Sequence, residues 1–182
     1  NFGGDSSSVN SNLNSEVVEI VPSSGAFAAL KLDGSVVTWG GSAYGGDSSS
    51  VSSDLSSNVI TISTFSDFKH KGVVTIHDGA AFAALKSDGS VVTWGHSDYG
   101  GDSSSVSSDL SSGVEEVFAT KGAFAALKSD GTVIVWGDSD SGGIGAPTSN
   151  DISQIMSTRN GFLAIKSDGA ATSLVMGSED VV

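Results

Sequence analysis

The sequence predicts an all-β protein built from four repeats of about 42 residues. A segment with the core Ala-Phe-Ala-Ala-Leu-Lys and a closing Trp-Gly occupies residues 25–40 and returns at 80–95 and 122–137, with a degenerate copy from residue 160. A Gly-Gly-Asp-Ser-Ser-Ser block begins at residues 3, 45 and 100, and Gly-Gly-Ile-Gly replaces it at residue 142. Self-similarity at a fixed period indicates a stacked or radial repeat architecture. No segment shows a convincing amphipathic helical pattern.

The repeats predict one domain, residues 1–182, with units at approximately 1–40, 41–95, 96–137 and 138–182. The second unit is longer than the others, which places an insertion near residues 60–78. Residues 59–63 and 73–77 both alternate apolar with polar side chains, so they predict an inserted strand pair with residues 66–72 as its loop.

Each unit is expected to hold about three short antiparallel strands. In the first unit, residues 26–31 and 35–39 form a hairpin, and Asp33-Gly34 predicts a two-residue turn in which both residues take positive φ. A further strand precedes each hairpin, at residues 17–21, 73–76, 114–118 and 152–156. Apolar side chains occupy both faces of the hairpin, which favours sheets packed on both sides, as in a propeller or alternatively a solenoid.

The large aromatic residues recur in phase with the hairpins. We interpret them as a repeated packing core rather than a sugar-binding platform. They are Trp39, Trp94, Trp136, Phe27, Phe82, Phe124 and Phe162. The last unit has Leu174-Val-Met176 where a Trp is expected, which is typical of a terminal capping repeat. Lysines at 31, 86, 128 and 166 flank the hairpin turns and are expected to serve solubility and turn geometry.

The segment Phe82-Ala-Ala-Leu-Lys-Ser-Asp-Gly-Ser-Val-Val-Thr-Trp-Gly95, together with Gly142-Gly-Ile-Gly-Ala-Pro147, resembles the regulator-of-chromosome-condensation (RCC-type) repeat family. The resemblance covers all four units and implies that each is a β-propeller blade. The family's propeller normally has seven blades, whereas four units are present here. The family's partner functions are nucleotide exchange on a small GTPase and chromatin binding. This chain is nearly devoid of Arg, so the resemblance does not imply these functions for it. The chain looks more like divergent serine-rich versions of the repeat in secreted or surface proteins of microbes.

Composition excludes several classes of function. Eight Lys and Arg stand against 21 Asp and Glu, for a net charge of −13, so no nucleic-acid partner is expected. The absence of cysteine excludes disulfides, thiolate zinc sites and cysteine nucleophiles. Apolar runs fall far short of the roughly 20 residues that span a bilayer, so no membrane span is expected.

The chain is not expected to be an enzyme. Its three histidines, His70, His77 and His96, lie in or near the insertion and one loop, and no Gly-x-Ser-x-Gly elbow is present. A serine nucleophile needs a base within hydrogen-bond reach, and the sequence indicates no such pair.

The residues leave two further features open, calcium binding and O-glycosylation. Aspartates in flexible loops offer hard oxygen ligands for calcium, although their spacing matches no known calcium loop, and capping of turns by the Asp side chain is the favoured interpretation. The weak calcium candidates are Asp138, Asp140, Asp47 and Asp102. No other cofactor is expected. The serine runs at residues 6–8, 48–50 and 103–105 permit O-glycans in a secreted chain.

The two chain ends look like complementary halves of one repeat. Residues 1–4 match the Tyr-Gly-Gly segments that elsewhere follow a Trp-Gly strand, and the chain ends near the strand that should precede such a block. The ends either meet within one molecule or join one copy to the next. The assembly candidates are Asn1, Phe2, Gly3, Gly4, Asp5, Val181 and Val182.

The leading hypothesis is therefore a non-enzymatic extracellular or cell-surface structural protein. It would self-assemble head to tail into a filament or surface layer, so its expected partner is itself. The alternative is a monomeric β-propeller module that recognises a protein or a glycan through its loops.

Overall fold

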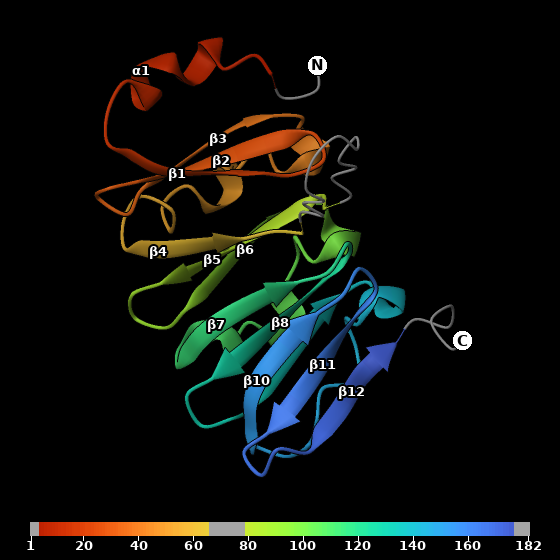
Figure 1. The fold of residues 1–182 in the computed structure, drawn as a ribbon. Coiled ribbons are helices and arrows are strands. Elements are labelled where there is room, and N and C mark those ends of the chain that lie inside the picture. The colour runs from red at the N-terminus through yellow and green to blue at the C-terminus, as the bar shows by residue number, and fades with distance from the viewer. Residues whose placement is uncertain (1–3, 66–78, 177–182) are drawn as a thin grey trace, which may run out of the picture.

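The computed structural model describes residues 4–65 and 79–176, which form four three-stranded antiparallel sheets (Figure 1). Each sheet is one blade, and its strands are ordered as they are along the chain. The blades are β1 (Val17–Pro22), β2 (Ala26–Lys31) and β3 (Val36–Gly40); β4 (Val59–Ser63), β5 (Ala81–Lys86) and β6 (Val91–Gly95); β7 (Val114–Ala119), β8 (Ala123–Lys128) and β9 (Val133–Gly137); and β10 (Ile152–Ser157), β11 (Gly161–Lys166) and β12 (Ala171–Met176). The predicted all-β architecture of four repeated units is confirmed.

The first strand of blade 2 is β4, so the expectation that residues 73–76 fill this place is wrong. Val59 follows Leu55 at the same distance as Val17 follows Leu13, and β4 pairs with β5 through Thr61 and Ile62. The extra residues of this unit therefore lie between the first and second strands of the blade. Residues 66–78, with the predicted loop and second inserted strand, lie outside the described residues.

The middle strand of each of the first three blades is buried on both faces. In β5, Ala83 and Ala84 are fully buried, and in β8 the same holds for Ala125 and Ala126. Alternation sends successive side chains to opposite faces, and alanine is small enough to let a neighbouring blade approach. The expectation of sheets packed on both sides is confirmed.

Phe and Trp lie directly opposite each other on the last two strands of blades 1 to 3. Phe82 pairs with Trp94 and Phe124 with Trp136, with ring centroids 5.2 and 5.5 Å apart. All four of these side chains are at most 2% exposed, which confirms the predicted aromatic core. The indole Nε1 of Trp94 also donates to the carbonyl of Gly45, 3.0 Å away in the segment that follows β3 of blade 1. Each such pair therefore ties one blade to the blade before it; Trp136 repeats the bond with Gly100.

Glycine is required where the aromatic ring meets the segment that follows the last strand of the preceding blade. Gly45 has φ of +90°, and a Cβ there would lie 2.5 Å from the ring of Phe82. Gly100 and Gly142 repeat this arrangement against Phe124 and Phe162. The Gly-Gly block thus marks the seam between consecutive blades.

The hairpin turn differs from the predicted two-residue turn. The Lys31 N–H donates to the Ser35 carbonyl and the Gly34 N–H to the Lys31 carbonyl, so the loop has three residues. Gly34 has positive φ, +76°, whereas Asp33 does not. Asp33 instead accepts from the Ser35 backbone N–H and hydroxyl, at 2.9 and 2.7 Å. The aspartate is therefore selected as an acceptor within the turn, in a three-residue hairpin loop.

Single helical turns lie in the serine-rich segments before blade 1 and between the blades. They comprise α1 (Asn10–Leu13) and the 3-10 helices η1 (Ser7–Val9), η2 (Ser42–Tyr44), η3 (Ser49–Val51), η4 (Ser97–Tyr99), η5 (Ser104–Val106), η6 (Asp109–Ser111) and η7 (Ser139–Ser141). Leu55 and Leu110 in these connections are 2% exposed and fill the space between neighbouring sheets.

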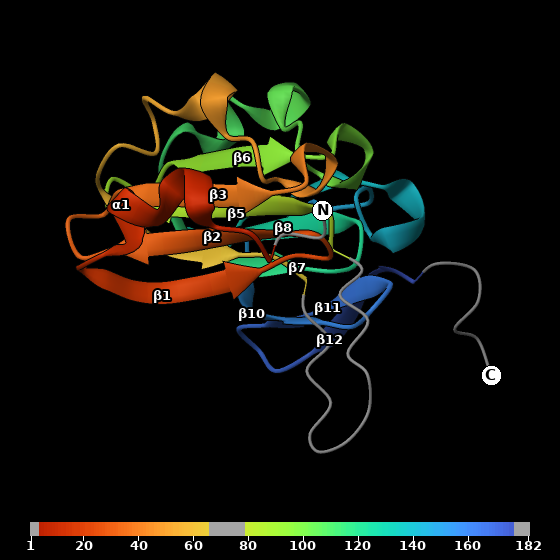
Figure 2. The ribbon, with the colours of Figure 1, turned by 90° about the horizontal axis from the view of Figure 1, so that it is seen from above.

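The blades fan out in chain order as an open arc, with blade 1 at one end and blade 4 at the other (Figures 1 and 2). The core consists of three clusters, each between two consecutive blades. The described sheets do not close into a ring, so one face of blade 1 and one face of blade 4 have no neighbouring sheet.

Candidate functional site

Each blade has a leading face, which packs on the blade before it, and a trailing face, which packs on the blade after it. The leading face of blade 2 carries Ile62, Phe82 and Trp94, and these contact the trailing-face residues Ala28 and Leu30 of blade 1. Blades 2 and 3, and blades 3 and 4, repeat this arrangement with the equivalent residues. The chain therefore contains three examples of one interface.

The leading face of blade 1 exposes a position that is buried in every other blade. Ile20 is 51% exposed. The equivalent residues Ile62, Val117 and Ile155 are 6%, 8% and 2% exposed. Phe27 is likewise only half-buried, whereas Phe82, Phe124 and Phe162 are at most 2% exposed. Ile20 thus has an apolar side chain at a position that packs against the preceding blade elsewhere, but in blade 1 no sheet among the described residues covers it.

The segment before β1 covers part of this face. Helices η1 and α1 lie over blade 1 in both views, and η1 contacts β3 (Figures 1 and 2). Leu13 takes the place that Leu55 and Leu110 hold between blades, yet it is only half-buried. The segment therefore packs as a connection between blades does, but no preceding sheet lies against it.

The trailing face of blade 4 exposes apolar side chains in the same way. Leu163 is 36% exposed, although the equivalent Ala28, Ala83 and Ala125 are fully buried. Met156, directly opposite Leu163 on β10, is 51% exposed. Within residues 4–65 and 79–176, both ends of the arc therefore offer an apolar surface that no further sheet covers.

Only part of the predicted assembly site can be placed. Gly4 and Asp5 are exposed, and Asp5 accepts from the Ser7 N–H at 3.0 Å, which makes it a turn residue. Asn1, Phe2, Gly3, Val181 and Val182 lie outside the described residues. The sequence interpretation missed Ile20, Met156 and Leu163. One signal was visible: Leu163 replaces an alanine that the other three units share.

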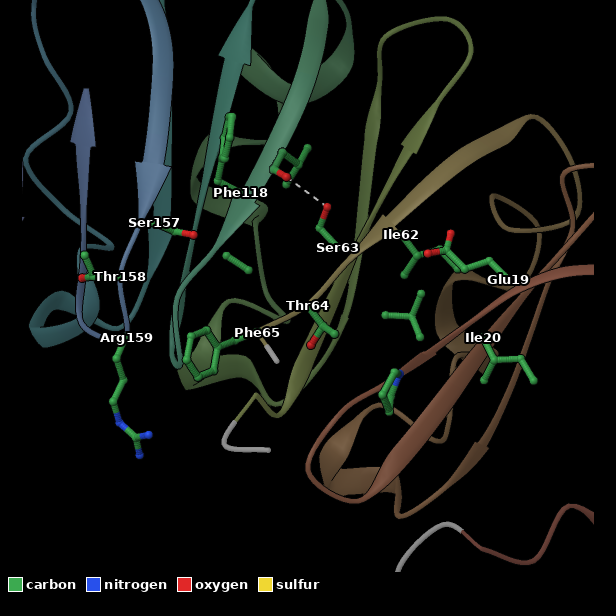
Figure 3. Close-up of a pocket in the computed structure, with 14 residues that line it drawn as sticks. Glu19, Ile20, Ile62, Ser63, Thr64, Phe65, Phe118, Ser157, Thr158 and Arg159 are labelled. Atoms are coloured by element: carbon green, nitrogen blue, oxygen red, sulfur yellow. Dashed lines mark hydrogen bonds between the residues drawn. The ribbon is translucent and has the colours of Figure 1, made fainter. Parts of the chain in front are cut away.

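The first strands of all four blades line one cavity of about 860 Å³ on the inner side of the arc (Figure 3). Glu19 of blade 1, Ser63 of blade 2, Phe118 of blade 3 and Arg159 of blade 4 contribute to its wall. The Ser63 hydroxyl donates to the Val117 carbonyl at 3.0 Å, across the seam between blades 2 and 3. The described residues that line it include no histidine.

The histidine that can be placed is a turn residue. His96 Nδ1 accepts from the Asp98 N–H at 3.3 Å, and its ring packs on Tyr99 with centroids 4.9 Å apart. His70 and His77 lie outside the described residues.

Three of the four calcium candidates, Asp47, Asp102 and Asp138, act as turn acceptors, whereas Asp140 donates its backbone N–H to Asp138. Asp47 and Asp102 accept from the N–H groups of Ser49 and Ser104, each at 2.9 Å, and Asp138 accepts from Asp140 N–H and the Ser141 hydroxyl. Within residues 4–65 and 79–176, no three carboxylates or imidazoles gather as they would around a metal ion.

The turn lysines reach carbonyls and carboxylates of neighbouring connections. Lys31 Nζ donates to the Asn12 carbonyl at 3.0 Å, and Lys128 Nζ to the equivalent Asp109 carbonyl at 2.8 Å. Lys166 Nζ lies 3.2 Å from Asp151. These contacts fix the helical turns to the ends of the hairpins.

Hydrogen bonds in the hairpin turns lower the pKa of their aspartates. Bonds from the Ser35 hydroxyl and N–H lower the pKa of Asp33, and Ser90 does the same for Asp88. The Thr132 N–H lowers the pKa of Asp130. Because the ionised form is favoured in the folded chain, these groups stabilise the fold above their unfolded pKa, near 3.8.

Acid is therefore expected to destabilise the fold through these turns. The stabilisation is present above about pH 4 and is lost as the pH falls through the lowered pKa values. Thermal melts between pH 2 and 7 should show a steeper acid limb for the natural chain than for the variant Asp33→Asn/Asp88→Asn/Asp130→Asn, whose turns keep an acceptor that does not titrate. Equal acid limbs would contradict this role.

None of the described helices is long and apolar enough to span a bilayer.

Comparisons with known proteins support the fold. No protein-family model matches the sequence, and no curated protein matches it significantly. Among solved structures, the arc superposes on human WBSCR16 at 18% identity with a TM-score of 0.52, covering 88% of this chain and 48% of that one. It superposes on yeast RCC1 (Prp20), solved in complex with Kap60, at 14% identity with a TM-score of 0.53, covering 86% and 43%. It also superposes on the ectodomain of the Physcomitrella patens receptor kinase CR4 at 13% identity with a TM-score of 0.51, covering 86% of this chain and 40% of that one.

The chain therefore spans about half the length of the solved structures that it matches. At these identities the likeness shows the fold alone, which is an RCC1-like arrangement of propeller blades.

Proposed function

We propose that this chain is a non-enzymatic structural protein that joins to further copies head to tail, with the trailing face of blade 4 seated on the leading face of blade 1. The observation that carries the proposal is Ile20, which is 51% exposed where its three equivalents are at most 8% exposed. Burial of apolar surface is the main favourable term in association, and the three internal seams supply the template for the contact.

The occupant of each end face is inferred to be a second copy because the two faces are two halves of one repeated interface. Blade 1 retains the leading-face residues Phe27, Ala29 and Trp39 at the positions of Phe82, Ala84 and Trp94. Blade 4 retains an apolar trailing face, with Leu163 and Met156. Repetition of the contact gives a filament if successive copies rise along the axis, and a ring if they return to the start.

A location outside the cell or at its surface is part of this proposal. It is supported by the serine-rich blocks and the acidity, which are features of the sequence alone. O-glycans on exposed serines such as Ser49 and Ser104 would be compatible with the fold, because these side chains lie on the outer turns.

A second candidate is a binding module, favoured by a cavity of about 660 Å³ at the turn side of the arc. Tyr44 and Tyr99 line it at equivalent positions, each 39% exposed, beside His96 and Lys121. Proteins of this fold bind other proteins, as the structure of Prp20 with Kap60 and the reported binding of Prp20p to Gsp1p and histones illustrate. A chain that stays monomeric would favour this candidate.

Thiol labelling tests the head-to-tail proposal, because the chain has no cysteine of its own. A cysteine at Ile20 should react rapidly in dilute solution and at least about tenfold more slowly at high protein concentration, where association covers it. Val18→Cys is the matched control, since Val18 is 56% exposed and its equivalent in blade 2, Ile60, is 57% exposed even inside the arc. Equal labelling rates for Ile20→Cys at all concentrations would refute the proposal.

A further inference from the structure

We propose that the cavity lined by Tyr44, Tyr99 and Lys121 binds an acidic oligosaccharide, through the carboxylates and the ring faces of its hexuronate units. This inference rests on the second candidate function, to which it adds the class of ligand, and it does not depend on the head-to-tail contact. The cavity has a volume of about 660 Å³. This lies within the range of about 300–1,000 Å³ that is usual for small-molecule sites.

The loops between the first two strands of the blades meet at this cavity. In blades 1 and 2 the Ser24 N–H donates to the Gly79 carbonyl at 2.8 Å, and in blades 3 and 4 the Lys121 N–H donates to the Arg159 carbonyl at 3.0 Å. These four residues have the same place in the four blades, since each lies two residues before the start of the middle strand. The backbone arrangement repeats there, whereas the side chain differs in every blade.

Two cations at this place do not follow the repeat. The hairpin lysines recur in every blade, at 31, 86, 128 and 166, but Lys121 and Arg159 stand where blades 1 and 2 have serine and glycine. Both line the cavity, and Figure 3 shows the Arg159 side chain extending away from the other labelled residues, beyond the ends of the strands. In a chain with a net charge of −13, two such cations at one cavity indicate a ligand that carries a negative charge.

Two tyrosines supply the aromatic wall. Tyr44 ends η2 and Tyr99 ends η4, and each is 39% exposed. The buried Ser23 hydroxyl donates to the Tyr44 carbonyl at 2.7 Å, which fixes its turn. A Cβ on Gly25 would lie 2.6 Å from the Tyr44 ring, and Gly122 gives the Tyr99 ring the same close approach, at 3.0 Å. Rings held against the backbone in this way offer flat apolar surfaces with a polar hydroxyl, which suit the face of a sugar ring.

The other polar groups of the wall favour a ligand that carries hydroxyls. The Asp138 carboxylate lines the cavity and accepts from the Asp140 N–H and the Ser141 hydroxyl, at 3.2 and 2.6 Å. A carboxylate has about four acceptor sites, so it can accept further bonds. His96 Nδ1 accepts from the Asp98 N–H, and the neutral ring therefore carries its proton on Nε2, where it can donate.

A hexuronate meets all of these requirements. Its carboxylate pairs with the cations, its hydroxyls donate to the carboxylate of the wall and accept from the imidazole, and its ring faces lie on the tyrosines. A phosphate group brings no ring face, and an acidic peptide brings carboxylates without the hydroxyls of a sugar.

Calorimetric titration of the dilute chain tests the inference. The probes are trisaccharides of galacturonate, mannuronate and guluronate, with galactotriose and mannotriose as neutral controls. At least one acidic trisaccharide should bind at least about tenfold more tightly than the neutral ones, and Lys121→Ser and Tyr99→Ser should each weaken it at least about tenfold. Serine stands at these two places in blades 1 and 3, so the repeat accommodates both changes. Lys86→Ser removes the same charge at a hairpin turn and should bind like the natural chain.

Three outcomes would overturn the inference. They are no binding of any acidic trisaccharide, equal binding by Lys121→Ser and the natural chain, and binding of tetraglutamate as tight as that of the trisaccharides. The last, if Lys121→Ser abolishes it, refutes the sugar while the binding module stands. Labelling of Ile20→Cys reports on the head-to-tail contact separately, so failure of one proposal is distinguishable from failure of the other.

Discussion

Replacing Ile20 with aspartate is expected to abolish self-association while the monomer remains folded. The side chain is half exposed in the isolated arc, so a carboxylate there stays hydrated and the fold loses little. In the assembled state, the same carboxylate would be buried against the apolar trailing face of blade 4 without a partner. Such burial costs several kcal/mol, and about 1.4 kcal/mol corresponds to a tenfold change in affinity. Association should weaken by about 100-fold or more.

Val18→Asp is the matched control for this variant. It lies on the same strand, and it is 56% exposed. Its equivalents Ile60, Glu115 and Ser153 are exposed in every other blade, so the position lies outside each seam. Sedimentation velocity over a concentration series should show association for the natural chain and Val18→Asp, and a monomer for Ile20→Asp. Association of Ile20→Asp at the natural strength would contradict the assigned interface.

Phe82→Ala is expected to cause the largest loss of fold stability. The ring is fully buried between blades 1 and 2, stacks on Trp94 at 5.2 Å and lies against Gly45 in the segment that follows β3. Removing a buried Phe side chain leaves a cavity and costs about 3–5 kcal/mol. For a chain of this length, that lowers Tm by roughly 6–20 °C.

The equivalent change in blade 1, Phe27→Ala, should cost less when measured in dilute solution. Phe27 stacks on Trp39 at the same 5.2 Å, but no preceding sheet covers the pair, and the ring is only half-buried. Chemical denaturation of both variants measures the difference directly. Equal losses of unfolding free energy would show that the seam between blades adds nothing to the aromatic pair.

The repeated hairpins and their aromatic core were predictable from the sequence because local signals agree there. Alternation in Ala-Phe-Ala-Ala-Leu assigns both faces, and Asp-Gly marks the turn. The predicted turn type was wrong because Asp-Gly fits both a two-residue and a three-residue hairpin loop. Only the pairing of Lys31 with Ser35 decides between the two loops. The first strand of blade 2 was misplaced because residues 59–63 and 73–76 share one pattern. The correct choice depends on pairing with β5, which is a long-range contact.

The end faces could not be predicted from composition or period. Ile20 and Ile62 have the same place in the repeat and the same side chain, yet one is half exposed and the other is 6% exposed. The difference arises because none of the described sheets lies against the leading face of blade 1, which only the arrangement of the sheets reveals. Leu163 is the partial exception, because a leucine in a row of alanines already signals a different environment.

The mass of the natural chain in solution tests most directly whether the two end faces bind each other. Sedimentation equilibrium across a concentration series should show a mass that rises above 18.2 kDa as the concentration increases. A mass that stays at 18.2 kDa at every concentration would contradict the account, since the exposed faces of blades 1 and 4 would then not join copies of this chain.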